Sequence, residues 1–266
     1  MTRMLARTNF HSSKLIRCLA SLDMVDVVDP GNAFAEKLGL WVHFADAITL
    51  SAVHSDSVAS PSKSQSGMPR VAQAAARASA AAAAATEFER TEASLVNSIM
   101  KSCSPNAGKS HISLPAPELG LPLNLATAFV PYRRFYEEHQ RDMELRIQPL
   151  RCNVREALAK ASPRLGKLAD LDAALEKILR ERERQLLSKV PALLKKRFEQ
   201  LFREHQQKLL DARQADNPAG WAQAGAWLAR FCNDMQMLLL AEAELRLQPA
   251  MGLIEAFNEY TKQDTQ

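Results

Sequence analysis

Apolar side chains recur in alternating steps of four and three residues in the second half of the chain, from Pro131 onward. Steps of three and four place side chains on one face of an α-helix, and their alternation is typical of a coiled-coil seam. Such faces are buried only when helix packs on helix, so the pattern predicts an all-α protein. The first run, with one polar member, is Tyr136, Gln140, Met143, Ile147, Leu150, Val154, Ala157 and Ala161.

Breakers divide this half of the chain into several helices. Ser162 is the predicted N-cap of a helix that begins at Pro163, and Pro191 should break or kink the next stretch. The sequence "DNPAGW" predicts a turn before the last long helix. Long helices joined by short loops favour antiparallel neighbours. We therefore expect residues 131–266 to form a helical bundle or antiparallel coiled-coil hairpins.

The first half of the chain predicts a looser organisation. Residues 1–54 are predicted to contain two short helices, which bury little surface on their own. We therefore expect this segment to dock on the rest of the chain, on a second copy or on a partner. Poly-alanine has high helix propensity but little area to bury. The predicted segments are a small N-terminal helical module at 1–54, a flexible Ser-rich linker at 55–68, an Ala-rich helix at 69–101 and a Pro/Ser linker at 102–130.

A hexapeptide occurs twice, as ELRIQP at 144–149 and ELRLQP at 244–249. Proline lacks a backbone donor, so we expect each copy to kink or end its helix. We also expect Leu145 to share the apolar side of the helix with Ile147. Two interpretations stay open, a convergent helix–proline–helix joint and an internal duplication of a helical hairpin.

Sequence motifs for catalysis are missing. The "NAGKS" stretch at 106–110 resembles the end of a phosphate-binding loop, but Cys103 stands where that loop needs glycine. The six histidines form no HxxxH, HExxH or ExxH pattern, and the four cysteines form no CxxC. The sequence therefore predicts no catalytic, cofactor-binding or metal-binding residue, and a protein that is not an enzyme.

The charge pattern bears on possible partners. The formal net charge is +4, and acidic and basic residues interleave along the predicted helices, which indicates a solvated mixed-charge surface. We expect a scaffold or adaptor that binds proteins through helical surfaces or self-associates. The alternative is a nucleic-acid-associated regulator using the helices at 12–50, where "AFAEKLGLWVHFADAI" loosely fits a helix-turn-helix. Its reading face would present apolar residues from Trp41 to Phe44, which favours a core or protein-docking role.

Aromatic residues make up only 6% of the chain. Exposed aromatics dominate interface energetics, so those near the ends of the predicted helices are candidates for partner binding. Their alternative role is the core of the bundle. The candidate partner-binding residues are Trp41, Phe44, Trp221, Trp227 and Phe231.

No stretch approaches the length of a membrane span, and the scattered cysteines fit a reducing compartment.

Several stretches together resemble a family of uncharacterised proteobacterial proteins, a domain of unknown function of about this length. The resemblance implies an all-helical bacterial protein of the cytoplasm with no catalytic residue to transfer. It also implies an accessory role in an envelope-associated complex, beside proton-channel and outer-membrane-anchoring components. The stretches that carry the resemblance are "RTNFHSSKLIRCLASL", "FAEKLGLWVHFADAITLSA", "MELRIQPLRCNVREALAKASPRLGKLADLDAALE" and "WAQAGAWLARFCNDMQMLLLAEAELRLQPAMGLIEAF".

Overall fold

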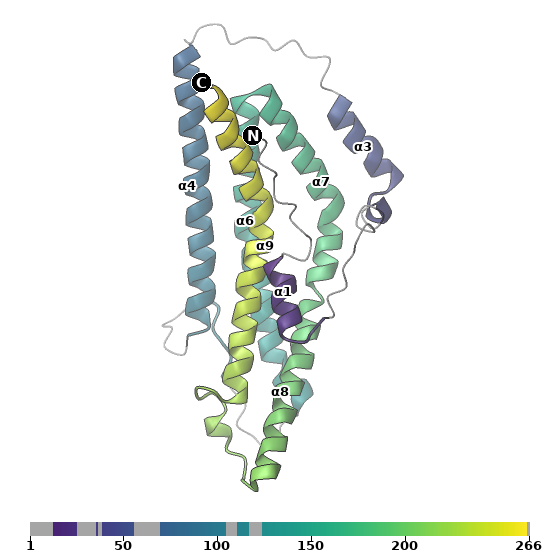
Figure 1. The fold of residues 1–266 in the computed structure, drawn as a ribbon, viewed down its shortest axis with the longest axis vertical. Coiled ribbons are helices and arrows are strands. Elements are labelled where there is room, and N and C mark those ends of the chain that lie inside the picture. The colour runs from purple at the N-terminus through teal and green to yellow at the C-terminus, as the bar shows by residue number, and fades with distance from the viewer. Residues whose placement is uncertain are drawn as a thin grey trace, which may run out of the picture. The chain divides into compact units, whose positions relative to one another are not determined.

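Helices are the regular elements of the described chain, and the described residues contain no strand (Figure 1). A computed structural model describes residues 13–25, 36, 39–55, 70–104, 111–116 and 124–264. The all-α prediction is confirmed, whereas the coiled-coil geometry stays a prediction. The elements are α1 (Lys14–Ser21), α3 (Phe44–Ser55), α4 (Arg70–Ser102), α5 (Leu125–Ala128), α6 (Val130–Ala161), α7 (Pro163–Leu187), α8 (Val190–Ala212), the 3-10 helix η3 (Pro218–Gly220) and α9 (Trp227–Asp264).

The chain forms two compact units, and each combines segments that are far apart in the sequence. Helices α4, α6 and α9 each contribute residues to both units. The predicted division ran along the chain, whereas the compact units interleave its segments. Unit 1 comprises residues 1–29, 95–143 and 188–245, and unit 2 comprises residues 30–94, 144–187 and 246–266.

The core of unit 1 is built from aromatic rings. Phe198 and Phe231 have ring centroids 5.0 Å apart at 80°, and Tyr132 meets Phe231 at 5.5 Å and 90°. Edge-to-face pairs of this kind add to the stabilisation that burial alone provides. Apolar residues of α9, including Leu238 and Met235 at 0% exposure, extend this core.

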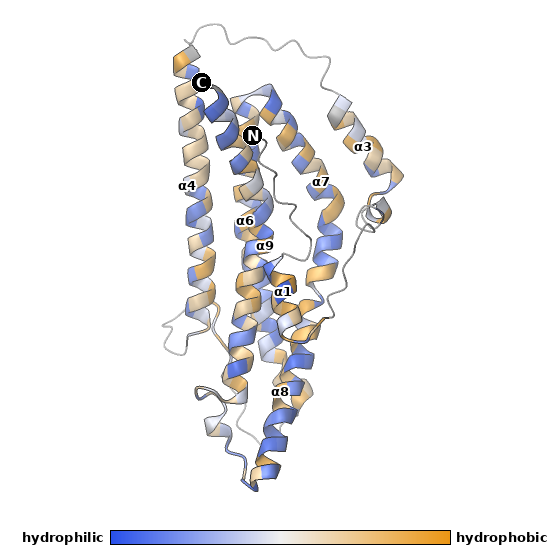
Figure 2. Ribbon diagram, viewed as in Figure 1, coloured by the Kyte–Doolittle hydropathy of each residue, from blue (hydrophilic) through white to orange (hydrophobic). Residues whose placement is uncertain are grey.

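The core of unit 2 is largely aliphatic and draws buried residues from α6, α7 and α9. Leu150 and Leu158 of α6 are 1% and 0% exposed, and Phe257 of α9 is 0% exposed. The predicted cap of α7 is confirmed, because the Ser162 hydroxyl accepts a hydrogen bond from the Leu165 amide at 3.2 Å. Helix α3 packs against α7. Figure 2 shows α4 pale along its alanine run, as expected for residues of weak hydropathy.

The two ELRxQP segments do not end their helices. Pro149 lies inside α6 and Pro249 lies inside α9, so of the two expected outcomes the helix end is wrong for both, and the kink stays a prediction. A proline at position i removes the hydrogen bond to the carbonyl of residue i−4. For Pro149 that carbonyl belongs to Leu145, which is 75% exposed and leaves room for water. The helix therefore continues across the missing bond.

The expected apolar side of the ELRxQP segment is also wrong in part. Ile147 is 7% exposed and Leu247 3%, but Leu145 points outward. Residues two apart lie about 200° apart around a helix of 3.6 residues per turn, so both members of such a pair cannot face the core. By contrast, the break expected at Pro191 is confirmed, because α7 ends at Leu187 and α8 begins at Val190.

Candidate functional site

The first candidate surface lies on α3, in unit 2. Phe44 is 84% exposed and Ile48, one turn later, is 55% exposed. Leu40, in the helical turn just before α3, is 74% exposed, and Trp41 is half-buried. Phe44 and Ile48 stand four apart on α3, and residues 39–55 contain no Lys or Arg.

The start of α3 is held by a local cap. The backbone amide of His43 donates to the Asp46 carboxylate at 3.0 Å, and the His43 carbonyl accepts from the amides of Asp46 and Ala47. His43 is therefore at the N-cap position, and an acidic residue three positions later reaches back to it, as in a capping box. The cap places Phe44 in the first turn of α3. In the sequence, Asn32 after the turn residues Asp29, Pro30 and Gly31 is the predicted N-cap of a helix in this region, and it lies outside the described residues.

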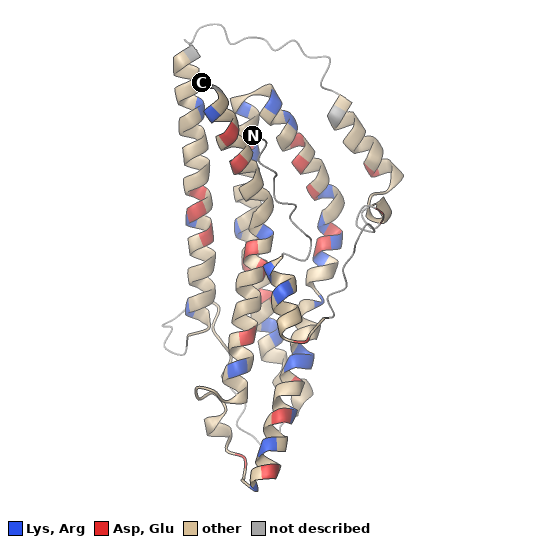
Figure 3. Cartoon of the chain, viewed as in Figure 1, with Lys and Arg blue, Asp and Glu red and all other residues tan. Residues whose placement is uncertain are grey.

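Among the aromatic residues that the structure describes, Phe44 is the only one that is exposed. Trp41, Phe88 and Tyr260 are half-buried, and the other described aromatic side chains are buried. Phe44 thus differs in kind from the aromatic residues of the cores. Figure 3 shows that α3 carries little charge, whereas basic and acidic residues alternate along α7.

The other candidate aromatic residues lie in the core of unit 1. Trp221, Trp227 and Phe231 are 2%, 5% and 0% exposed, which is the alternative role that the sequence left open. Trp221 and Trp227 pack edge to face with centroids 5.4 Å apart. The five candidates therefore do not form one surface, since three are buried in unit 1 and two belong to unit 2.

Asp216 anchors the edge of this aromatic core. Its Oδ1 accepts a hydrogen bond from Trp221 Nε1 at 2.8 Å and lies 3.0 Å from His205 Nε2. The indole N–H of Trp227 has no hydrogen-bond partner in the described part of the chain. Trp227 makes edge-on contacts with Phe198 and Phe202, each at 5.2 Å, and such rings accept only weakly from N–H groups.

Buried polar pairs connect α6 to its neighbours in unit 1. Ser102 of α4 and His139 of α6 are 2% and 1% exposed, with Oγ and Nε2 2.8 Å apart. Glu242 of α9 is 0% exposed, and it accepts hydrogen bonds from Tyr136 Oη at 2.8 Å and from Gln140 Nε2 at 3.0 and 3.1 Å. Gln140, the polar member of the predicted seam, thus faces a carboxylate. The acceptor Glu242 was not foreseen from the sequence.

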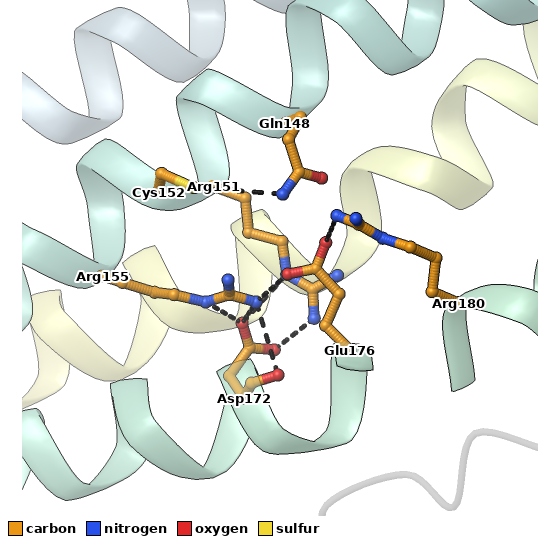
Figure 4. A network of polar contacts seen from close by, with 7 residues as sticks. All are labelled: Gln148, Arg151, Cys152, Arg155, Asp172, Glu176 and Arg180. Carbon is orange, nitrogen blue, oxygen red and sulfur yellow. Dashed lines mark hydrogen bonds and ion pairs between the residues drawn. The ribbon is translucent and has the colours of Figure 1, made fainter. Parts of the chain in front are cut away.

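The densest polar cluster of unit 2 joins α6 to α7 (Figure 4). Asp172 Oδ2 accepts from Arg151 Nε at 2.9 Å and from Arg155 Nε at 2.7 Å. Glu176 pairs with Arg155 and accepts from Arg180 Nη2 at 2.9 Å. The side chains of Arg151, Arg155, Asp172 and Glu176 are only 12–15% exposed, so this cluster is largely removed from water.

The protonation states of this cluster follow from its pairing. Burial by itself would raise the pKa of Glu176, but hydrogen bonds from Arg155 and Arg180 outweigh it and hold that pKa below its ordinary value. Burial would lower the pKa of Arg155, but hydrogen bonds to Asp172 and Glu176 raise it. Glu176 is thus held ionised against arginines and is not poised as a general base. The cluster joins two helices.

The sequence signal for this cluster was present but incomplete. Arg151 and Arg155 stand four apart, as do Asp172 and Glu176. Such spacing puts each pair on one helix face. Which face of α6 meets which face of α7 depends on the packing register, which no local pattern states.

The described residues contain neither a membrane-spanning helix nor a metal-binding cluster. None of the described helices is long and apolar enough to cross a membrane. Within the same residues, no group of three or more His, Cys, Asp or Glu side chains could hold a metal ion.

These features define a helical protein in which the polar clusters around Ser102, Glu242 and Asp172 join one helix to another. The chain belongs to the family described as "Protein of unknown function (DUF3348)", whose model matches residues 1–259. The family resemblance found in the sequence is confirmed. No curated protein and no solved structure matches the chain.

Proposed function

We propose that this protein is a non-enzymatic helical adaptor that binds a protein partner through the start of α3. The single observation that carries the proposal is the exposure of Phe44, at 84%, where the other described aromatic residues are buried or half-buried. Leaving a phenylalanine in water forgoes about 2 kcal/mol of burial free energy. A protein partner would recover that free energy on binding.

The surroundings of Phe44 suit a helix that docks into an apolar groove of a partner. Phe44 and Ile48 stand four apart on α3, which is a spacing of anchors in helix-in-groove recognition, and Leu40 lies in the turn before the cap at His43. The surface also lacks basic residues between 39 and 55, so phosphate contacts would have to come from elsewhere. This supports a protein partner over the alternative of nucleic-acid binding by residues 12–50.

The position of α3 is stabilised by packing within unit 2, which favours binding of a partner through its exposed residues. It packs on α7, and α7 is joined to α6 by the cluster of Arg151, Arg155, Asp172 and Glu176. A binding residue on a helix that is packed against the rest of its unit loses less conformational entropy on association than a residue on a flexible segment.

The wider setting of this adaptor follows the family resemblance. We place it in the bacterial cytoplasm, as an accessory of an envelope-associated complex. The four cysteines are free thiols, which fits a reducing compartment. Self-association through the same surface is a second form of protein binding that the experiment below distinguishes.

The test compares a variant of Phe44 with a matched control. Phe44→Asp is expected to lose capture of a native partner, whereas Leu210→Asp, at a 72% exposed site of α8, should retain it. Both proteins would serve as bait in a lysate of the native bacterium, with captured proteins quantified by mass spectrometry. Sedimentation of the purified wild type reports self-association.

A protein lost with Phe44→Asp and kept with Leu210→Asp would be purified and added back. Hydrogen exchange of residues 39–55 should then slow on binding. Identical capture and identical sedimentation by wild type and both variants would show that this surface binds no protein, and the proposal would fail.

A further inference from the structure

Two cysteines of unit 1, Cys103 and Cys232, lie near the contact between the end of α4 and the start of α9. Gln236 Nε2 of α9 contacts Met100 Sδ of α4 at 3.0 Å. The two helices run in opposite directions (Figure 1). Cys103 follows Met100 by three residues, and Cys232 precedes Gln236 by four. In antiparallel helices these two steps lead the same way along the axis.

Helix geometry places the two cysteines at nearly the same level. With a rise of about 1.5 Å per residue, the steps from the Met100–Gln236 contact are about 4.5 Å and 6 Å. At about 100° per residue, Cys103 lies within about 60° of Met100 around its helix axis, and Cys232 lies within about 60° of Gln236. Cys103 and Cys232 therefore both face the contact between α4 and α9. Both are partly exposed, so a small reagent can reach them.

The polar surroundings also set Cys103 apart. Ser102 Oγ lies 4.0 Å from Cys103 Sγ and 2.8 Å from Nε2 of buried His139. Cys18 lies on α1, and Cys152 lies on the part of α6 that belongs to unit 2. These two cysteines serve as internal controls.

We propose that Cys103 and Cys232 form a reversible disulfide that clamps the end of α4 to the start of α9. The oxidant is a low-molecular-weight disulfide. The Cys103 thiolate attacks one sulfur of that disulfide, which forms a mixed disulfide and expels one small thiol. The Cys232 thiolate then attacks Cys103 Sγ, which forms the Sγ–Sγ bond and expels the second small thiol. Two electrons pass to the small disulfide, and the two cysteine protons end on the expelled thiols.

The order of attack follows from the acidity of the thiols. Burial raises the pKa of Cys103 to about 11, although the contact with Ser102 lowers it in part. The pKa of Cys232 is raised to about 12, mainly by burial and to a smaller extent by the charge of the nearby Cys103 thiolate. Only the thiolate attacks, so Cys103 reacts first and the clamp closes slowly at neutral pH. Cytosolic disulfides are typically transient and redox-sensing, which fits a clamp that closes only under sustained oxidation.

The test uses the full-length wild-type protein in buffers of defined ratios of oxidised to reduced glutathione. After equilibration, free thiols are alkylated, and disulfide-linked peptides are identified by mass spectrometry. A peptide joining Cys103 to Cys232 is expected, and it should disappear on reduction. Its rate of formation should rise about tenfold per pH unit between pH 7 and 9. The thermal midpoint of the oxidised protein should lie above that of the reduced protein.

Variants then separate this pair from the other cysteines. A Cys18→Ser/Cys152→Ser protein should form the link as the wild type does, and Cys103→Ser should not. If the folded wild type instead ends as separate glutathione adducts at both positions, or forms no link in fully oxidised buffer, the pair is not a disulfide site. An unchanged or lower thermal midpoint of the linked protein would show that the bond does not fit the native packing, which would also overturn the clamp.

Discussion

The ion cluster between α6 and α7 allows a stability prediction whose size can be worked from its contacts. Arg155 donates to Asp172 from Nε at 2.7 Å, donates to the Asp172 carbonyl from Nη2 at 3.3 Å, and pairs with Glu176. Replacing Arg155 by methionine keeps most of the aliphatic stem but removes these bonds. Removing one partner of a buried ion pair costs about 3–5 kcal/mol, because a charge is left uncompensated.

The remaining arginines reduce that cost. Asp172 keeps Arg151, and Glu176 keeps Arg180, although the Arg180 side chain is 53% exposed. We therefore expect Arg155→Met to lower the free energy of unfolding by about 2–3 kcal/mol, somewhat below the range for a buried pair that is left uncompensated. Lys160→Met is the matched control on the same helix. Lys160 pairs with Glu156 at 3.4 Å with side chains 78% and 69% exposed, and such exposed pairs contribute little.

Urea unfolding at pH 7, followed by circular dichroism, measures both variants. The midpoint of Arg155→Met should fall clearly while that of Lys160→Met stays near wild type, with the slope m unchanged in both. If the two variants lose the same free energy within about 0.5 kcal/mol, the cluster behaves as a surface network, and the reasoning from burial is wrong.

The same cluster predicts a pH dependence whose sign is determined by Glu176. Its pKa is lower in the folded protein than the ordinary value of 4.5. Its stabilising contribution is therefore fully present above the ordinary pKa and is lost as the pH falls through the folded pKa. The difference in unfolding free energy between wild type and Glu176→Gln should be largest at pH 6–7 and should shrink as the pH falls below 4.5. A difference that grows on acidification would contradict the lowered pKa.

Three further predictions follow from burial and backbone chemistry. Phe231→Ala should cost about 3–5 kcal/mol in urea unfolding, whereas Phe44→Ala should cost less than about 0.5 kcal/mol, and equal losses would refute the contrast between core and surface. Cys103 should be alkylated by iodoacetamide at pH 8 at least about tenfold more slowly than exposed Cys152, as read by peptide mass spectrometry, and equal rates would refute its raised pKa. Pro149→Ala should raise the free energy of unfolding by about 1–2 kcal/mol. An exposed proline inside a helix costs about 3 kcal/mol, and by restricting the unfolded chain it recovers up to about 1 kcal/mol of that cost. A fall in the free energy of unfolding would show that α6 needs the proline.

Local rules were sufficient where a residue acts on its own helix. The Ser162 cap, the break at Pro191 and the turn at "DNPAGW" all depend on neighbours in the chain, and the structure has them. The seam residues from Tyr136 to Val154 are buried at their apolar positions for the same reason. A period of 3.6 residues sets which side chains share a face, whatever the partner helix is.

Rules of this kind failed where tertiary packing decides. An isolated helix gains nothing by continuing through Pro149 or Pro249, so a local argument kinks the helix or ends it there. In the folded chain, burial of Leu150 at 1% and Ala250 at 0%, each directly after its proline, outweighs the lost hydrogen bond. The exposure of Phe44 was likewise undecided, because apolar periodicity does not tell a core face from a docking face.

Each unit contains a carboxylate, buried in unit 1 and largely removed from water in unit 2, that accepts from donors on α6. In unit 1 the acceptor is Glu242 of α9, with Tyr136 and Gln140 as donors. In unit 2 the acceptors lie on α7, and the donors on α6 are arginines. An apolar seam that repeats every seven residues could slide by one repeat at modest cost, but a slide would leave these buried acids without partners. The polar contacts therefore oppose such a slide and hold the helices in register within each unit.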